Sequence, residues 1–159
     1  MNLTAHFTDS EIKYGEIPPA YQRAFLDGLI YVMEPIRKAY GKAIRINSAW
    51  RSRVHNASDA VKGQKNSQHL GQWKAPDGIW YPSAAFDFED WATGLVDELW
   101  PVCTRLVLAR EVPCDQLIHE RGKVHASYVA GRVPRYEILM QTIEDGKFVY
   151  ANFENQHSA

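Results

Sequence analysis

Six histidines are the side chains of this chain best suited to bind a metal ion, because neutral imidazole is a common metal ligand. Two of them occupy positions that a sheet would hold in place. His69 follows a polar loop that itself follows a predicted strand, and His125 lies in the strand-like run Val124-His125-Ala126-Ser127-Tyr128. Ligands from distant parts of a sequence converge at loops and strand ends of this kind. We therefore take His69 and His125 as candidate ligands and expect the other four histidines to be non-ligands.

Helical patterns dominate the N-terminal segment. The run Thr8-Asp9-Ser10-Glu11 has the form of a capping box and predicts a short helix near residue 9. A longer helix is predicted after Pro18-Pro19, because apolar residues then recur at steps of three and four as far as Gly41. The residues on this apolar face are Phe25, Leu29, Val32, Ile36 and Tyr40. We expect the face to pack into the core.

Strand patterns follow in the rest of the chain. The predicted strands are residues 43–48, 84–88, 114–120, 123–128 and 147–150. The third and fourth can pair as a hairpin across Arg121-Gly122. Residues 90–110 are expected to be mostly helical, and the segment 133–153 begins with a short helical pattern. The sequence thus predicts a single α+β domain over residues 1–159, with helices on one face of a small, largely antiparallel sheet.

Composition and charge exclude several classes of protein. Hydrophobic residues make up 45% of the 159 residues and charged residues 23%, as in ordinary globular proteins, and the net charge is -1. No basic stripe indicates nucleic-acid binding, and no stretch is apolar enough to span a membrane. The N-terminus lacks the pattern of a signal peptide, so we expect synthesis in the cytoplasm. We expect a monomer.

The two cysteines, Cys103 and Cys114, carry little information about function. They are too far apart for a thioredoxin-like pair and too few for a disulfide framework. No second Cys or His pair accompanies them to make a structural zinc site. Ordinary buried or half-buried thiols are favoured over a disulfide.

Four segments spread over residues 3–135 follow the order of motifs of one enzyme family. They are Leu3-Thr4-Ala5-His6-Phe7-Thr8, Ile46-Asn47-Ser48-Ala49-Trp50-Arg51-Ser52, Asn66-Ser67-Gln68-His69-Leu70, and Asp115-Gln116-Leu117-Ile118-His119-Glu120 followed by Val124-His125-Ala126-Ser127-Tyr128. This order resembles the zinc D-Ala-D-Ala carboxypeptidase and L-alanyl-D-glutamate endolysin peptidase family. The resemblance implies a hedgehog/DD-peptidase-like fold, a catalytic Zn²⁺ and peptidoglycan peptides as substrate.

The third metal ligand is the first departure from the family pattern. Relatives carry an Asp seven residues after the first His, but position 76 here is Pro76. We interpret residues 72–83 as an inserted loop, which makes Asp87 the candidate ligand. Asp77 is the alternative, although it lies in a turn-like stretch, whereas Asp87 lies on a strand that can fix its direction. The aromatic residues of this loop could form a substrate wall or anchor the loop to the core.

The catalytic carboxylate is the second departure. Many relatives carry an acid two residues before the last His, where this chain has Lys123. A branch of the family that reads Asp-Gln-x-Ile-x-Glu implies Glu120 instead. A two-residue turn at Arg121-Gly122 would place Glu120 opposite Lys123 and on the same side as His125. The alternative is that Glu120 is only a solvated hairpin acid paired with Lys123.

The implied ligand set of His69, Asp87 and His125 suits hydrolysis. Three protein ligands leave one position of a tetrahedral zinc open for water, whose pKa then falls to about 7. Glu120 would take the proton of this water and return it to the leaving amine. By the same resemblance, Arg51 would bind the substrate carboxylate or the developing oxyanion.

Two further residues, Ser67 and Gln116, are expected to orient the ligands or contact the substrate. The resulting prediction is a zinc metallopeptidase that cuts peptidoglycan stem peptides, as a carboxypeptidase or an endolysin-type endopeptidase released after phage-type lysis. One alternative is a non-catalytic wall-binding or structural module of the same fold, such as a phage virion component. Another is a metallohydrolase that acts on a different amide or ester.

Overall fold

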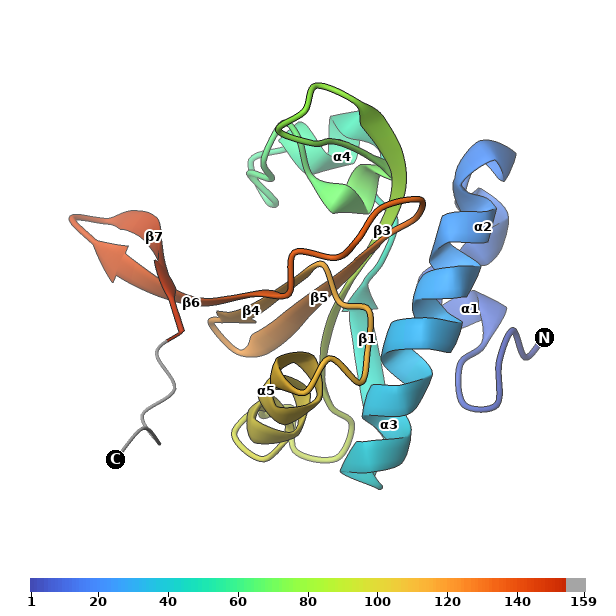
Figure 1. The fold of residues 1–159 in the computed structure, drawn as a ribbon, viewed down its shortest axis with the longest axis vertical. Helices are drawn as coiled ribbons and strands as arrows, with labels where there is room; N and C mark the ends of the chain where they lie inside the picture. Colours follow the sequence, from blue (N-terminus) through green and yellow to red (C-terminus); the bar gives the residue numbers. More distant parts are fainter. Residues whose placement is uncertain (154–159) are drawn as a thin grey trace.

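A seven-stranded sheet forms the centre of the computed structural model, which describes residues 1–153 (Figure 1). The strands are β1 (Ile44–Ser48), β2 (Gln72–Lys74), β3 (Trp80–Asp90), β4 (Gln116–Glu120), β5 (Lys123–Val129), β6 (Glu137–Glu144) and β7 (Lys147–Asn152). Their order is β1-β3-β5-β4-β6-β7, and β2 pairs with the start of β3. β4 and β6 run parallel, whereas the other pairs of these strands are antiparallel.

The α+β class is confirmed, but the sheet is mixed and not small, which corrects the prediction of a small, largely antiparallel sheet. After β5 the chain runs through residues 130–136 and returns beside β4, so that β6 points in the same direction as β4. Alternating polarity marks a strand but does not name its partner, so this return was not visible in the sequence. The hedgehog/DD-peptidase-like arrangement stays a prediction.

The short helix expected at the start of segment 133–153 is wrong, because β6 and β7 form a hairpin there. The turn is Asp145-Gly146, and both residues have positive φ, 49° and 73°. A two-residue type I′ turn requires this conformation at both positions, and Asp-Gly is among its preferred dipeptides. The dipeptide was the local signal for a hairpin.

The long predicted helix is confirmed as a continuous rod of α2 (Pro19–Gly28), the π-helical turn η2 (Leu29–Met33) and α3 (Glu34–Tyr40). It ends at Gly41, which has a φ of 73°. The expected apolar face is buried at Phe25, Leu29, Val32 and Ile36 and half-buried at Tyr40. Within segment 90–110, only α5 (Leu99–Leu108) is α-helical, and it packs against α3 and β4.

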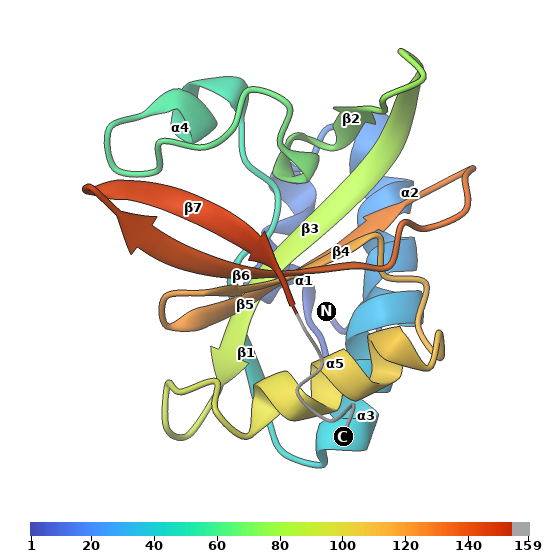
Figure 2. The same cartoon turned by 60° about the vertical axis from the view of Figure 1, so that its left-hand side comes forward.

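Shorter helices lie at two other places. The predicted N-terminal helix is α1 (Asp9–Ile12), where Glu11 accepts the Thr8 backbone N–H at 2.7 Å, and η1 (Tyr14–Glu16) follows it. α4 (Arg53–Ala57) lies apart from α2, α3 and α5 (Figure 2), and η3 (Gln68–Leu70) lies against β3 and β2. Among the described residues, no helix is both long and apolar enough to cross a membrane.

β3 separates the core from the polar face of the sheet. Phe86 and Phe88 are fully buried in the hydrophobic core, whereas Asp87 between them points to the opposite face. The Phe86 ring meets the Phe25 ring edge-on at 5.9 Å between centroids. The helix can approach β3 this closely because Gly28 has no side chain: a Cβ there would lie 2.8 Å from the Phe86 ring. The packing that fixes β3 therefore also fixes the direction of Asp87.

Replacing Gly28 with alanine should destabilise the protein by about 1–3 kcal/mol, because the new methyl group must displace a buried ring. Gly15→Ala is the matched control, since nothing lies within 4 Å of a Cβ at that position. Its effect should stay within about 0.5 kcal/mol. Urea unfolding of both variants and the wild type measures the difference. Equal stabilities of the two variants would contradict the close approach of the helix to β3.

Candidate metal centre

Three buried side chains from distant parts of the chain meet on the polar face of the sheet. Asp87 on β3 lies directly opposite His125 on β5, and His69 comes from η3. Asp87 Oδ1 lies 3.1 Å from His69 Nε2 and 3.0 Å from His125 Nδ1. The three side chains can each direct one ligand atom to a common point, with all three atoms within 4.8 Å of one another. The structure therefore brings together the three residues that the sequence proposed as ligands.

The donor set and its spacing fit a zinc ion. Zinc binds imidazole nitrogen and carboxylate oxygen at about 2.0–2.2 Å, so ligand atoms at the corners of a tetrahedron lie about 3.4 Å apart. The two separations of 3.1 and 3.0 Å around Asp87 Oδ1 are close to that value. Three ligands leave one tetrahedral position open, as in catalytic rather than structural zinc sites.

His69 is presented by a capped 3-10 turn. The Ser67 side chain accepts the His69 backbone N–H at 3.3 Å, and Gly71 closes the turn with a φ of 85°. The other ring nitrogen, Nδ1, lies 2.5 Å from the Ala49 carbonyl oxygen. Because a carbonyl can only accept, Nδ1 carries the proton and Nε2 keeps its lone pair for a metal. Ser67 thus orients the backbone of a candidate ligand.

Asp87 has more charged or ionisable partners than any other group of the site. Burial by itself would raise its pKa, but the neighbouring His69 and His125 hold the pKa of this carboxyl well below its usual range. The second carboxylate oxygen, Oδ2, accepts from the Arg51 guanidinium and from Lys123 Nζ, the latter at 2.8 Å. Burial lowers the pKa of His69, and the charge of Asp87 opposes this effect only in part. The site therefore favours an ionised Asp87 beside a neutral His69, the forms that bind zinc.

Arg51 lies at the β1 side of the cluster. Its Nε donates to Ser48 Oγ at 2.9 Å while another guanidinium nitrogen contacts Asp87. Its backbone N–H also donates to the His69 carbonyl oxygen at 2.9 Å. Arg51 therefore touches two of the candidate ligands, a contact for which the sequence offered no signal.

Glu120 lies opposite Lys123 across the Arg121-Gly122 turn, as the sequence predicted. Lys123 is two residues from His125, so its side chain emerges on the same face of the sheet. Lys123 Nζ contacts Glu120 Oε2 at 2.9 Å as well as Asp87 Oδ2. Glu120 thus lies on the same face as the His69–Asp87–His125 cluster, and the ion pair with Lys123 expected of a solvated hairpin acid is also present.

A buried network that the sequence did not indicate supports the turn that carries His69. Asp115 is fully buried and accepts from two guanidinium nitrogens of Arg135, at 2.9 and 2.7 Å. The same carboxylate accepts from the Gln68 side chain at 2.8 Å, one residue before His69. Gln116, expected to orient the ligands or contact the substrate, instead donates to Glu137 at 2.6 Å.

The alternative ligand Asp77 lies outside the cluster. It is exposed in the turn between β2 and β3, where it accepts from the Ile79 backbone and the Tyr81 hydroxyl. The inserted segment forms the β2–β3 hairpin, and the guanidinium of Arg135 lies 4.5 Å from the centroid of the buried Trp73 ring. Trp73 therefore anchors this hairpin, whereas Trp80 is half-exposed.

The other histidines that the structure describes, and both cysteines, lie outside the site. His119 points to the opposite face and meets the Trp100 ring edge-on at 5.0 Å, and His6 pairs with Glu34. His55 lies on α4, and His157 lies outside the described residues. Both cysteines are free and buried, which confirms the expectation of ordinary thiols, and burial raises the pKa of each.

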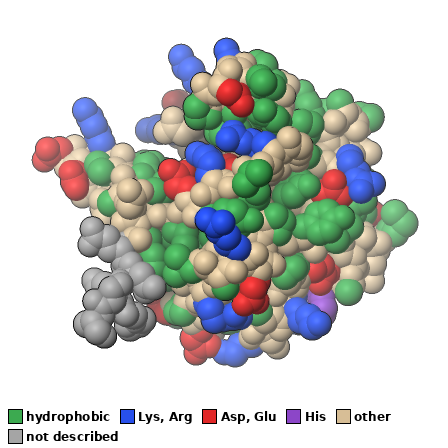
Figure 3. Space-filling view, viewed as in Figure 1, with side chains coloured by type: hydrophobic (Ala, Val, Ile, Leu, Met, Phe, Trp, Pro, Cys, Tyr) green, Lys and Arg blue, Asp and Glu red, His purple; other side chains and the backbone are tan. Residues whose placement is uncertain are grey.

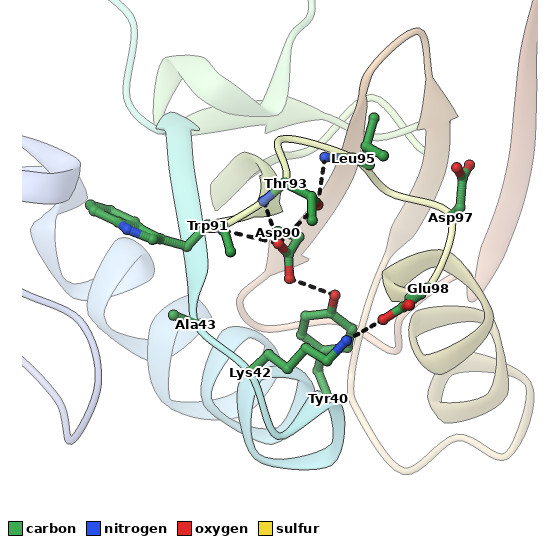
Figure 4. Close-up of a pocket in the computed structure, with 10 residues that line it drawn as sticks. Tyr40, Lys42, Ala43, Asp90, Trp91, Thr93, Leu95, Asp97 and Glu98 are labelled. Carbon is green, nitrogen blue, oxygen red and sulfur yellow. Dashed lines mark hydrogen bonds and ion pairs between the residues drawn. The ribbon is translucent and has the colours of Figure 1, made fainter.

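A cavity of about 480 Å³ opens at the far end of β3, around Asp90 (Figure 4). Asp90 is three residues from Asp87 and points to the other face of the sheet. Its carboxylate is already satisfied by the Tyr40 hydroxyl and by the backbone and side chain of Thr93, which lower its pKa to about 2. Lys42 in the same cavity pairs with Glu98. These polar groups bind one another and offer no ligand set comparable to the His69 cluster.

One comparison with known proteins identifies a family. A family model described as peptidase M15 matches residues 6–93, more than half of the chain. The matched segment contains His69 and Asp87 and ends before Glu120 and His125. No curated protein and no solved structure matches the chain.

Replacing Asp87 with asparagine should weaken zinc binding by roughly a hundredfold or more, since residues that only orient ligands are already worth about ten- to a hundredfold. Asp77→Asn is the matched control and should bind zinc like the wild type. Competition titration of metal-free protein against a zinc-chelating dye measures both affinities. Weaker binding by the Asp77 variant alone would move the third ligand to the β2–β3 turn.

Proposed function

The chain belongs to the peptidase M15 family, and from this premise we propose that it hydrolyses a peptide bond in the stem peptides of bacterial peptidoglycan. M15 peptidases depend on zinc, and the observation that carries the proposal is the buried cluster of His69, Asp87 and His125. The family supports a metallopeptidase. The peptidoglycan substrate and the roles of individual residues are our proposals.

The cluster would hold zinc through His69 Nε2, Asp87 Oδ1 and His125 Nδ1. When bound there, the ion supplies Lewis acidity, which polarises a carbonyl group and makes water acidic enough to ionise near neutral pH. Asp87 keeps its other oxygen on Arg51 and Lys123, so the ligand carboxylate is fixed from behind. A ligand held in this way needs no reorganisation during the reaction.

Glu120 is the proposed general base and acid. It takes the proton from the attacking water and delivers it to the nitrogen of the leaving amine. Lys123 holds Glu120 beside the cluster through the ion pair at 2.9 Å. Lys123 thus stands where many relatives carry the catalytic acid. In this chain it orients Glu120, which acts as the catalytic acid and base instead.

Arg51 is the proposed binding group for a substrate carboxylate or for the oxyanion that develops during attack. Its side chain is 12% exposed, and Nε and Nη2 donate to Ser48 and Asp87, so that among the described residues Nη1 has no hydrogen-bond partner. A guanidinium is always charged and can donate two parallel hydrogen bonds, which suits either anion.

One observation favours a second function, a non-catalytic wall-binding module. The Glu120 carboxylate forms an ion pair with Lys123, its cross-strand neighbour, which is the arrangement expected of a hairpin acid without a catalytic role. Under this alternative the chain would bind zinc and peptidoglycan without cutting a bond. Synthesis without a signal peptide, action after phage-type release and a monomeric state stay predictions.

Glu120→Gln should lower the rate of peptide-bond cleavage by roughly a hundred- to ten-thousandfold without loss of zinc, because the amide cannot accept the proton. Glu111→Gln, which changes an exposed acid three residues after α5, is the matched control. Mass spectrometry of peptidoglycan fragments, with and without a chelator, reports both the rate and the bond. If the zinc-loaded wild type releases no fragments, hydrolysis of peptidoglycan is ruled out, and binding of intact peptidoglycan would then support the non-catalytic module.

A further inference from the structure

The face of the sheet that carries the metal cluster continues across β4, β6 and β7. His125 on β5 lies opposite Ile118 on β4, which in turn lies beside Leu139 on β6. Because directly paired residues share a face and residues two apart share a face, Gln141 on β6 emerges on the same side. Its partner on β7 is Tyr150. The β6–β7 hairpin therefore extends the surface on which Glu120 and His125 lie.

This extension is apolar and open to solvent. Ile143 is 52% exposed, Phe148 is 61% exposed and Tyr150 is 39% exposed. Ile143 and Phe148 are direct cross-strand partners, so the three side chains form one strip on the metal-bearing face. The hairpin projects from the body of the molecule, with hydrophobic side chains among charged ones of both signs (Figures 1 and 3). Large apolar side chains gathered on one exposed face mark a binding surface.

A hydrogen-bonding pair borders the strip on the side nearer Glu120. Gln141 Oε1 accepts the Arg121 backbone N–H at 3.4 Å, and Gln141 Nε2 donates to the Tyr150 hydroxyl oxygen at 2.9 Å. A tyrosine hydroxyl that accepts one hydrogen bond still has its own hydrogen to donate. Among residues 1–153 that hydrogen has no acceptor. The Tyr150 O–H can donate to a backbone carbonyl of a bound peptide, and the apolar side chains beside it can contact a small side chain of that peptide.

The strand order gives the bound peptide a direction. Arg51 lies on the β1 side of Asp87, where Ser48 pairs with Asp87, whereas the hairpin lies on the β4 side of His125. The two groups therefore flank the metal cluster from opposite sides. β7 is three strands away from β5, about 14 Å at the usual strand spacing. An extended peptide covers this distance with about four residues.

We propose that the β6–β7 hairpin is the binding wall for the part of the substrate on the amino-terminal side of the scissile bond. Tyr150, held by Gln141, binds a backbone carbonyl there, and Phe148 and Ile143 contact apolar side chains. The carboxyl-terminal part lies toward Arg51. This assignment rests on the proposed peptidase function and adds the substrate's direction and the residues that select its length.

The test compares substrates of different length on zinc-loaded protein. The probes are the disaccharide-linked pentapeptide of peptidoglycan and versions shortened from the amino-terminal side of the bond that the wild type cuts. Phe148→Ala and Tyr150→Phe should each raise KM for the longest substrate about three- to tenfold with kcat unchanged, because they remove uniform binding. Both effects should vanish on the shortest substrate. Val149→Ala is the matched control, since Val149 lies on the same strand but points to the opposite face.

Each failure has its own signature. If the wild type cuts the substrates but Phe148→Ala and Val149→Ala behave alike at every length, the hairpin assignment is overturned and the peptidase function stands. If the wild type cuts nothing, calorimetric titration of the pentapeptide replaces the kinetic readout, and unweakened binding by Phe148→Ala overturns the assignment. Size-exclusion chromatography completes the test. If Phe148→Ala dissociates a dimer and changes nothing else, the strip is a contact between two copies of the chain and the assignment is overturned.

Discussion

The buried carboxylate of Asp87 is the constraint on which the rest of the structure depends. One of its oxygens faces two imidazoles, and the other faces a guanidinium and an ammonium group. A carboxylate that is almost fully buried is stable only when such partners surround it, and the loss of one partner from a buried pair is strongly destabilising. Asp87 therefore joins η3, β5 and the segment after β1 around one point.

The sheet makes this arrangement possible by separating two tasks onto its two faces. Along β3, phenylalanines pack against the helices while the residue between them joins the polar cluster. The core fixes the strand, and the strand fixes the carboxylate within the narrow tolerance that metal binding needs. The Asp115–Arg135–Gln68 network performs a similar task for the turn that carries His69.

The segment between His69 and Asp87 and the residue Lys123 are the two places where the chain departs from the motifs that it otherwise resembles. Asp87 is the eighteenth residue after His69, because a complete hairpin, β2 with the start of β3, lies between them. His69 and Asp87 remain in contact because β2 and β3 pair with each other and β3 pairs with β5, so the hairpin does not move the two residues apart. At the β4–β5 turn, a lysine stands where relatives carry an acid, and its ammonium group bridges Asp87 and Glu120. The positive charge of Lys123 offsets the repulsion between these two carboxylates.

The sequence by itself determined the features that depend on neighbours along the chain. The capping box at Thr8, the helical spacing up to Gly41 and the two-residue turn at Arg121-Gly122 are local signals, and the structure contains all three features. Alternation on β5 was enough to place His125 on the same face as Lys123. Motif order was enough to nominate His69, whereas Asp87 was nominated by its place on a predicted strand.

Only the tertiary structure decided which distant segments meet. The parallel pairing of β4 with β6, the contact of Arg51 with Asp87 and the buried bond from Gln68 to Asp115 join residues that are 20 or more positions apart. No local pattern encodes such pairs, because a strand or a polar side chain has many partners that satisfy the same propensity. The chain settles on one set of partners when the core is packed and each buried charge has found a counter-charge.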